Sequence, residues 1–374
     1  MNKNIFESTI PCVDISQIAA AHSLTDRVEG VYLGHPDTVI PNSGFLYTFY
    51  PCGHGKGAIV MKRSTDGGKS WSDRLPLPES FKTSMETPTV YLIEPNGKPQ
   101  RVLLVSGMPY DRGGFRTAWS DDGCQTFTEL RDFYDNMELR TIVAHASLTR
   151  LRDKNGWQDR WMGIFHDGTF NNWKTYLTFD QQGNEQWSVP QRLLEEHDAI
   201  EKMAQLCEIE VVRSPDGQEL ALLARAQKKV TNAMVAFSTD EGEHWTAPVE
   251  LPRVLMGERH KACYNRAQDR LVVTFRDIIR NPQQDEQWMA GDLMAWVGRY
   301  DDLHGRREGD YTVRLGKDYS LGRGGDCGYA GNVLTGDNTF AVTSYGHWDQ
   351  EEPTESYVIT ALLDLTETDR LASN

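Results

Sequence analysis

The chain has 374 residues, a formal net charge of −15 and a hydrophobic content of 39%, a balance typical of a globular protein with a sizeable core. Its negative charge disfavours nucleic acid and anionic membrane surfaces as partners, and no apolar run approaches the roughly 18 residues of a membrane-spanning helix. Ten Trp, fourteen Tyr, thirteen Phe and 32 Gly favour an all-β protein rich in tight turns.

The first residues of the chain carry Glu7, Asp14 and Ser16 where a secretory signal has an apolar stretch, so we expect no signal peptide. The six cysteines are widely scattered, without a Cys-x-x-Cys pair or the Cys/His spacing of a zinc site. We therefore expect free thiols and a cytoplasmic protein. Helical patterns occur only at 14–24 and 195–206, and we expect both segments at the periphery.

A short turn sequence then recurs along the chain. Three copies match closely (STDGGKSW, SDDGCQTF and STDEGEHW), and a looser copy, TFDQQGNEQW, lies between the second and the third. In each copy, hydroxyl and carboxylate oxygens can accept hydrogen bonds from backbone N–H groups, and glycine can take a positive φ. The turn aspartates lie 56, 58 and 60 residues apart, at Asp66, Asp122, Asp180 and Asp240.

The regular spacing predicts the architecture. Each close copy follows a strand-like segment, so one period of about 58 residues contains one hairpin signature and corresponds to a four-stranded unit. Such units stack radially as propeller blades, and the chain is long enough for six of them. We predict an all-β fold, a six-bladed β-propeller of four-stranded antiparallel blades, as a single domain over 1–374 with its blades at roughly 28–365.

The turn resembles the Asp box, also called the bacterial neuraminidase repeat. On this motif the chain is similar to the sialidase (neuraminidase) superfamily over about residues 28–365. The resemblance implies a propeller whose turn aspartates are scaffold, so Asp66, Asp122 and Asp240 are excluded from the active site. It also implies an activity on glycosides, although propellers host unrelated chemistries and plain binding platforms.

Two segments resemble the catalytic segments of that family. LCEIEVVRSPDGQELALLARAQ resembles the one in which a glutamate opens an inner strand and an arginine ends the next, here Glu208 and Arg225. GDCGYAGN resembles the one that supplies the tyrosine nucleophile, here Tyr329. The resemblance implies that Glu208 activates the phenol and Arg225 binds a substrate carboxylate. A neutral phenol can approach an anomeric carbon whose own carboxylate repels Asp or Glu, but its pKa near 10 requires a base.

Other positions depart from the family pattern. Arg276 ends a clear strand and is a candidate for a second anion-binding arginine. The place of the family's leading arginine holds His35 or Asp37. The loop that carries the acid/base aspartate holds His54 and Lys56, and the place of a second glutamate holds His347.

Histidines therefore recur near inner-strand positions. Besides those already named, they include His145, His166 and His260. Two interpretations remain open: acid/base work by imidazole near neutral pH, and a histidine-rich metal site. No local segment has metal-ligand spacing, so we assign no metal. His54, flanked by glycines, is the leading candidate for the proton donor, while Asp167 and Asp326 are alternative proton carriers.

The sequence thus predicts an exo-glycosidase that releases a terminal acidic sugar, sialic acid or a related ulosonic acid, without a cofactor. The candidate catalytic residues are Tyr329, Glu208 and His54. The candidate substrate-binding residues are Arg225, Arg276, His35, Asp37, His166, Asp326 and His347. Two alternatives remain: a lyase or hydrolase that acts on uronate-containing glycans with a Tyr/His pair, and a non-catalytic carbohydrate-binding propeller. The partner in each case is an acidic glycan or a small glycoside, and the oligomeric state is left open.

Overall fold

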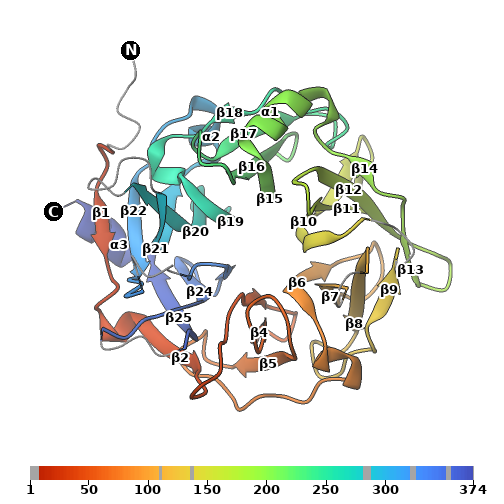
Figure 1. The fold of residues 1–374 in the computed structure, drawn as a ribbon, viewed down its shortest axis with the longest axis horizontal. Coiled ribbons are helices and arrows are strands. Elements are labelled where there is room, and N and C mark those ends of the chain that lie inside the picture. Colours follow the sequence, from red (N-terminus) through yellow and green to blue (C-terminus); the bar gives the residue numbers. More distant parts are fainter. Residues whose placement is uncertain are drawn as a thin grey trace.

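The computed structural model describes residues 8–108, 112–134, 139–280, 288–320, 326–350 and 355–373. Their strands form six sheets arranged as a ring around a central axis (Figure 1). Within each sheet the consecutive strands are antiparallel neighbours. The predicted six-bladed propeller is confirmed.

The first four blades follow the chain in order. The strands of blade 1 are β3 (Asp37–Val39), β4 (Leu46–Pro51) and β5 (Ile59–Ser64). Those of blade 2 are β6 (Met85–Ile93), β7 (Arg101–Gly107), β8 (Phe115–Ser120) and β9 (Arg131–Phe133). Those of blade 3 are β10 (Thr141–Asp153), β11 (Gly156–Asp167), β12 (Asn172–Phe179), β13 (Glu185–Trp187) and β14 (Gln191–Arg192). Those of blade 4 are β15 (Leu206–Arg213), β16 (Leu220–Ala226), β17 (Met234–Ser238) and β18 (Val249–Glu250).

The last two blades also take strands from the beginning of the chain. Blade 5 contains β19 (Gly257–Asn265), β20 (Arg270–Arg280), β21 (Trp288–Gly298) and β22 (Tyr311–Gly316), with β1 (Cys12–Asp14) parallel to β22. Blade 6 contains β23 (Ala330–Leu334), β24 (Thr339–Gly346), β25 (Tyr357–Asp364) and β2 (His22–Asp26). Because β2 pairs with β25, the first and last parts of the chain close the ring together (Figure 1).

Helices are few and peripheral. They are α1 (Asp198–Ala204), α2 (Tyr300–Gly305) and α3 (Leu365–Ala372), with short 3-10 turns at Ala19–Ala21, Glu79–Lys82, Glu195–His197 and Arg253–Leu255. The helix predicted within 195–206 is confirmed. The helix predicted at 14–24 is wrong: Ala19–Ala21 is only a short 3-10 turn, and the last three residues of the segment belong to β2, which pairs with β25. Among the described helices, none is long and apolar enough to cross a membrane.

The recurring turns have the predicted hydrogen bonds. The Asp66 carboxylate accepts from the Ser70 backbone N–H at 2.9 Å, from the Ser70 hydroxyl at 2.6 Å and from the Ser64 hydroxyl at 2.8 Å. Similar bonds surround Asp122 and Asp240. These turns follow the third strand of a blade. In an antiparallel blade they therefore lie on the face opposite to the beginning of the innermost strand.

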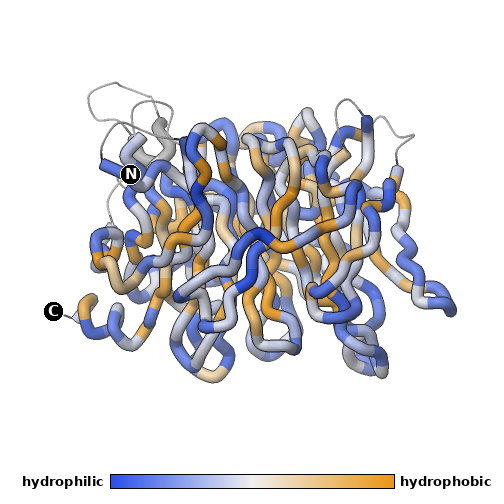
Figure 2. The backbone as a smooth tube through the Cα atoms, turned by 90° about the horizontal axis from the view of Figure 1, so that it is seen from below, coloured by the Kyte–Doolittle hydropathy of each residue, from blue (hydrophilic) through white to orange (hydrophobic). Residues whose placement is uncertain are grey.

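The hydrophobic core lies between neighbouring blades. Met162 and Ile164 of blade 3 pack with Leu206 and Leu222 of blade 4, for example, and the other blade interfaces are filled in the same way. Figure 2 shows hydrophobic segments running through the depth of the disc, with hydrophilic turns on both faces. This packing fixes each blade against the next, and the innermost strands come together around the axis.

Candidate functional site

A cavity of about 370 Å³ opens at one end of the axis, within the size range of small-molecule sites. It lies where innermost strands begin and second strands end, since these positions meet at the same edge of an antiparallel blade. Seven of the ten candidate site residues line it: His35, His54, Glu208, Arg225, Arg276, Asp326 and Tyr329.

Irregular backbone turns several of these side chains toward the axis. The pairing register of β15 shifts between Cys207 and Glu210, and Glu208 has a φ of 50°. His35, just before β3, has a φ of 55°. A positive φ in a residue other than glycine costs about 1–3 kcal/mol, and such strain clusters at functional sites. The alternating strand pattern of the sequence gives no sign of these bulges, so they could not be predicted from it.

Tyr329, Glu208 and Arg225 form a buried triad at the cavity. The Tyr329 hydroxyl donates a hydrogen bond to Glu208 Oε1, and Arg225 Nη1 donates to the same oxygen at 2.9 Å and to the Tyr329 hydroxyl at 3.3 Å. Burial alone would raise the pKa of Glu208, but Arg225 and the phenol outweigh it and lower the pKa to about 2. Burial and the nearby Glu208 charge raise the pKa of Tyr329. At rest the proton therefore stays on the phenol, beside an ionised acceptor.

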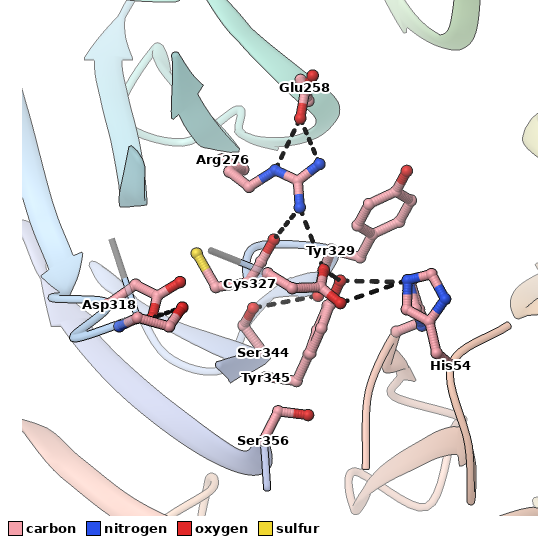
Figure 3. Close-up of polar contacts among 12 residues, drawn as sticks. His54, Glu258, Arg276, Asp318, Cys327, Tyr329, Ser344, Tyr345 and Ser356 are labelled. Carbon is pink, nitrogen blue, oxygen red and sulfur yellow. Dashed lines mark hydrogen bonds and ion pairs between the residues drawn. The ribbon is translucent and has the colours of Figure 1, made fainter. Parts of the chain in front are cut away.

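Glu258 links the two arginines of the cavity. Its carboxylate lies 2.8 Å from Arg225 Nη2 and accepts a hydrogen bond from Arg276 Nε at 2.7 Å (Figure 3). Arg276 Nη1 in turn donates to Asp326 Oδ1 at 3.2 Å. Glu208, Arg225, Glu258, Arg276 and Asp326 thus form one chain of alternating carboxylates and guanidiniums. Each guanidinium already contacts two carboxylates.

Glu258 was missed from the sequence, where only the neighbouring His260 was singled out. It lies at the start of β19 and pairs across the strands with Arg276. In blade 4 the residue paired across the strands with Arg225 is Cys207, and Glu208 is the next residue, so both blades place an acid near the start of the first strand in contact with an arginine of the second. Comparison of the two blades for an acid at the start of the first strand and an arginine late in the second would have found it.

At the rim, Asp326 is the centre of a polar group. Its carboxylate accepts hydrogen bonds from the Tyr32 and Tyr345 hydroxyls, each at 2.6 Å. His54 Nε2 lies 3.3 Å from Asp326 Oδ2, and the His54 side chain is 66% exposed. The buried His35 ring lies 4.9 Å from the His54 ring and 4.8 Å from the Tyr329 ring, measured between centroids. Burial lowers the pKa of His35 to about 3, so its ring is neutral.

Three candidate residues lie outside the cavity lining: Asp37, His166 and His347. Asp37 is 3% exposed and lies deeper along the axis, where its carboxylate accepts from the Val90 N–H at 3.0 Å and lies 3.4 Å from Lys261 Nζ. His166 is buried, stacks on Phe170 and donates to the Asp167 carbonyl. His347 follows β24.

The other residues singled out from the sequence have local partners. Asp167 organises a turn, since its carboxylate accepts hydrogen bonds from Thr169, Asn171 and Trp173. His145 stacks on an aromatic ring, and His260 lies in the core with its Nε2 bonded to a backbone carbonyl. These two histidines are thus accounted for by packing and by local hydrogen bonds.

No family model matches the chain, and no curated protein matches it. Solved structures do. A protein of unknown function from Dyadobacter fermentans has a TM-score of 0.66 at 15% identity, over 92% of this chain and 98% of that one. The intramolecular trans-sialidase of Ruminococcus gnavus has a TM-score of 0.60 at 12% identity, over 94% of this chain and 99% of that one.

The NanB sialidase of Streptococcus pneumoniae has a TM-score of 0.56 at 11% identity, over 92% of this chain and 70% of that one. The fold is that of a divergent sialidase-like propeller. At these identities the similarity establishes the fold alone. The chemistry of this sialidase-like propeller must therefore be argued from its own side chains.

Proposed function

We propose that the protein is a glycoside hydrolase that uses Tyr329 as its nucleophile. The observation that carries the proposal is the buried contact of the Tyr329 hydroxyl with both Glu208 and Arg225 at the cavity. As Tyr329 Oη bonds to the anomeric carbon, its proton passes to Glu208, and the bond to the leaving oxygen breaks as that oxygen takes a proton from solvent water at the mouth of the cavity. Water then attacks the anomeric carbon and breaks the glycosyl–tyrosine bond. Glu208 returns its proton to Tyr329 Oη, and the proton that the attacking water loses passes back to solvent.

A terminal acidic sugar is the proposed substrate. Two guanidiniums beside a tyrosine nucleophile support this choice, because a phenol tolerates a carboxylate on the anomeric carbon. Two of the similar structures are, by their names, a trans-sialidase and a sialidase. A neutral sugar is the second candidate, since Arg225 and Arg276 each already contact two carboxylates of the protein.

A panel of fluorogenic glycosides of sialic, ulosonic, uronic and neutral sugars tests the proposal. We expect release of one class by the wild type, near-complete loss in Tyr329→Phe, and a loss of about 10²-fold or more in Glu208→Gln. Tyr311→Phe is a matched control, because Tyr311 lies in blade 5, outside the cavity lining, with its hydroxyl bonded to Asp369 of α3. Mass spectrometry with a slow fluorinated glycoside of the same class should find the sugar on Tyr329.

Other outcomes identify the alternatives. An ultraviolet-absorbing unsaturated uronate among the products would indicate a lyase. Binding of a glycan without turnover, retained in Tyr329→Phe, would indicate a carbohydrate-binding propeller. Full activity in Tyr329→Phe would refute the proposed nucleophile.

A further inference from the structure

A second constellation lies at the rim of the cavity, and the proposed nucleophile chemistry does not use it. His35 precedes β3, His54 lies in the loop between β4 and β5, and Asp326 precedes β23. One ring nitrogen of each histidine and one oxygen of Asp326 all lie within 4.8 Å of one another. We call these three residues the rim cluster. Ring topology brings them together from opposite ends of the chain.

The spacing within the rim cluster suits a bound ion. His54 Nε2 and Asp326 Oδ2 are 3.3 Å apart, which is longer than the 2.7–2.9 Å of a charge-assisted N–H···O hydrogen bond. Two ligands at about 2.0–2.2 Å from a tetrahedral zinc ion lie about 3.4 Å from each other. The two side chains are thus already close to the separation that a shared cation would impose.

The surroundings of the cluster hold its ligands in place. The Tyr32 and Tyr345 hydroxyls both donate to Asp326, as outer partners of a metal-binding carboxylate do. His35 is buried, and its Nδ1 has no hydrogen-bond partner among the described residues. The His54 side chain is exposed and lies between glycines with positive φ, 145° at Gly53 and 59° at Gly55, so no core packing fixes the direction of its ring.

We propose that His35, His54 and Asp326 bind a divalent cation at the rim of the cavity. Two imidazoles and one carboxylate are the ligand set of zinc and similar borderline metals. Three protein ligands leave at least one coordination position open, as in catalytic rather than structural zinc sites. Since the cluster lines the cavity, the open position is available to a sugar oxygen or to water. In this assignment His54 is a metal ligand and not the proton donor expected from the sequence.

Metal binding can be measured without any substrate. Protein stripped with a chelator is dialysed against Zn²⁺, and bound zinc is counted by mass spectrometry; Co²⁺ is then used to read the coordination from its visible absorption. We expect about one equivalent in the wild type and a tetrahedral or five-coordinate Co²⁺ spectrum. His54→Ala should weaken binding by about 100-fold or more. Because the side chain is exposed, this variant should keep the wild-type melting temperature.

His244→Ala is the matched control. His244 Nδ1 lies 2.7 Å from Asp240 Oδ2, a second histidine–aspartate pair, but on an exposed turn where the described residues offer no third His, Cys, Asp or Glu ligand. This variant should bind zinc as the wild type does. The proposal fails if the wild type binds clearly less than one equivalent, if His54→Ala binds as tightly as the wild type, or if the equivalent is lost in His244→Ala instead. Asp326→Asn, compared in the same way, should also lose the ion.

Discussion

Replacement of Glu258 by glutamine perturbs the alternating chain of charges at its centre. Of the three carboxylates in that series of alternating charges, Glu258 alone contacts both guanidiniums, Arg225 at 2.8 Å and Arg276 at 2.7 Å. It is almost completely buried. Glutamine has the same shape but no charge and only one acceptor oxygen. One guanidinium would then face an amide N–H₂ group instead of an oxygen.

The size of the effect follows from these contacts. Removal of one partner of a buried ion pair costs about 3–5 kcal/mol, and a charge-assisted hydrogen bond exceeds a neutral one by about 1 kcal/mol. Since Glu258→Gln keeps one acceptor, we expect a loss of about 3 kcal/mol in the free energy of unfolding. For a chain of 374 residues, the unfolding entropy converts this loss into a melting temperature lower by about 4 °C.

Equilibrium unfolding in urea, followed by tryptophan fluorescence, measures the change. Glu79→Gln is the control: Glu79 has a 76% exposed side chain paired with Lys82, so its loss should cost less than about 0.5 kcal/mol. If Glu258→Gln is as stable as the wild type to within about 0.5 kcal/mol, the two guanidiniums do not depend on Glu258. That result would refute the argument that the Glu258 carboxylate stabilises both guanidiniums of the cavity.

Two further predictions concern the scaffold. Hydrogen bonds from Ser70 lower the pKa of Asp66 to about 2, below its usual 3.8, so this carboxylate should stabilise the fold above about pH 4 and lose that contribution as the pH falls toward 2. In thermal melts, Asp66→Asn should be less stable than the wild type at pH 7, and the difference should be much smaller at pH 2; a difference independent of pH would contradict this. Gly331→Ala should cost about 1–3 kcal/mol, because its Cβ would lie 2.4 Å from the Thr38 backbone nitrogen, and an unchanged urea midpoint would contradict that packing.

The spacing of the turns was sufficient to predict the propeller, because each turn is a local structure with its own side-chain signature. The closing strand β2 could not be predicted in this way. Its residues, HSLTD, have weak strand character, and their conformation is fixed by pairing with β25 more than three hundred positions later. The same long-range pairing holds the last three residues of the helical pattern at 14–24 in an extended strand.

For the site, the residues predicted from local segments, Tyr329, Glu208 and Arg225, lie together at the cavity. What the sequence could not reveal is the bulged backbone that aims Glu208 inward, since register shifts leave no mark on residue type. Asp37 also begins an inner strand, yet its side chain pairs with Lys261 below the cavity. How deep a side chain lies along the propeller axis thus depends on the bulge of its own strand, and not on its position in the repeat.

The pairing of β2 with β25 has a consequence for synthesis. On the ribosome, His22–Asp26 is synthesised long before β25, the strand with which it pairs. This segment therefore has no strand partner while the residues of five blades leave the exit tunnel. The cavity draws on residues from 35 to 329, so the pocket cannot be assembled until Tyr329 has emerged. The strands of the first four blades can therefore be synthesised before the cavity that they surround has all of its lining residues.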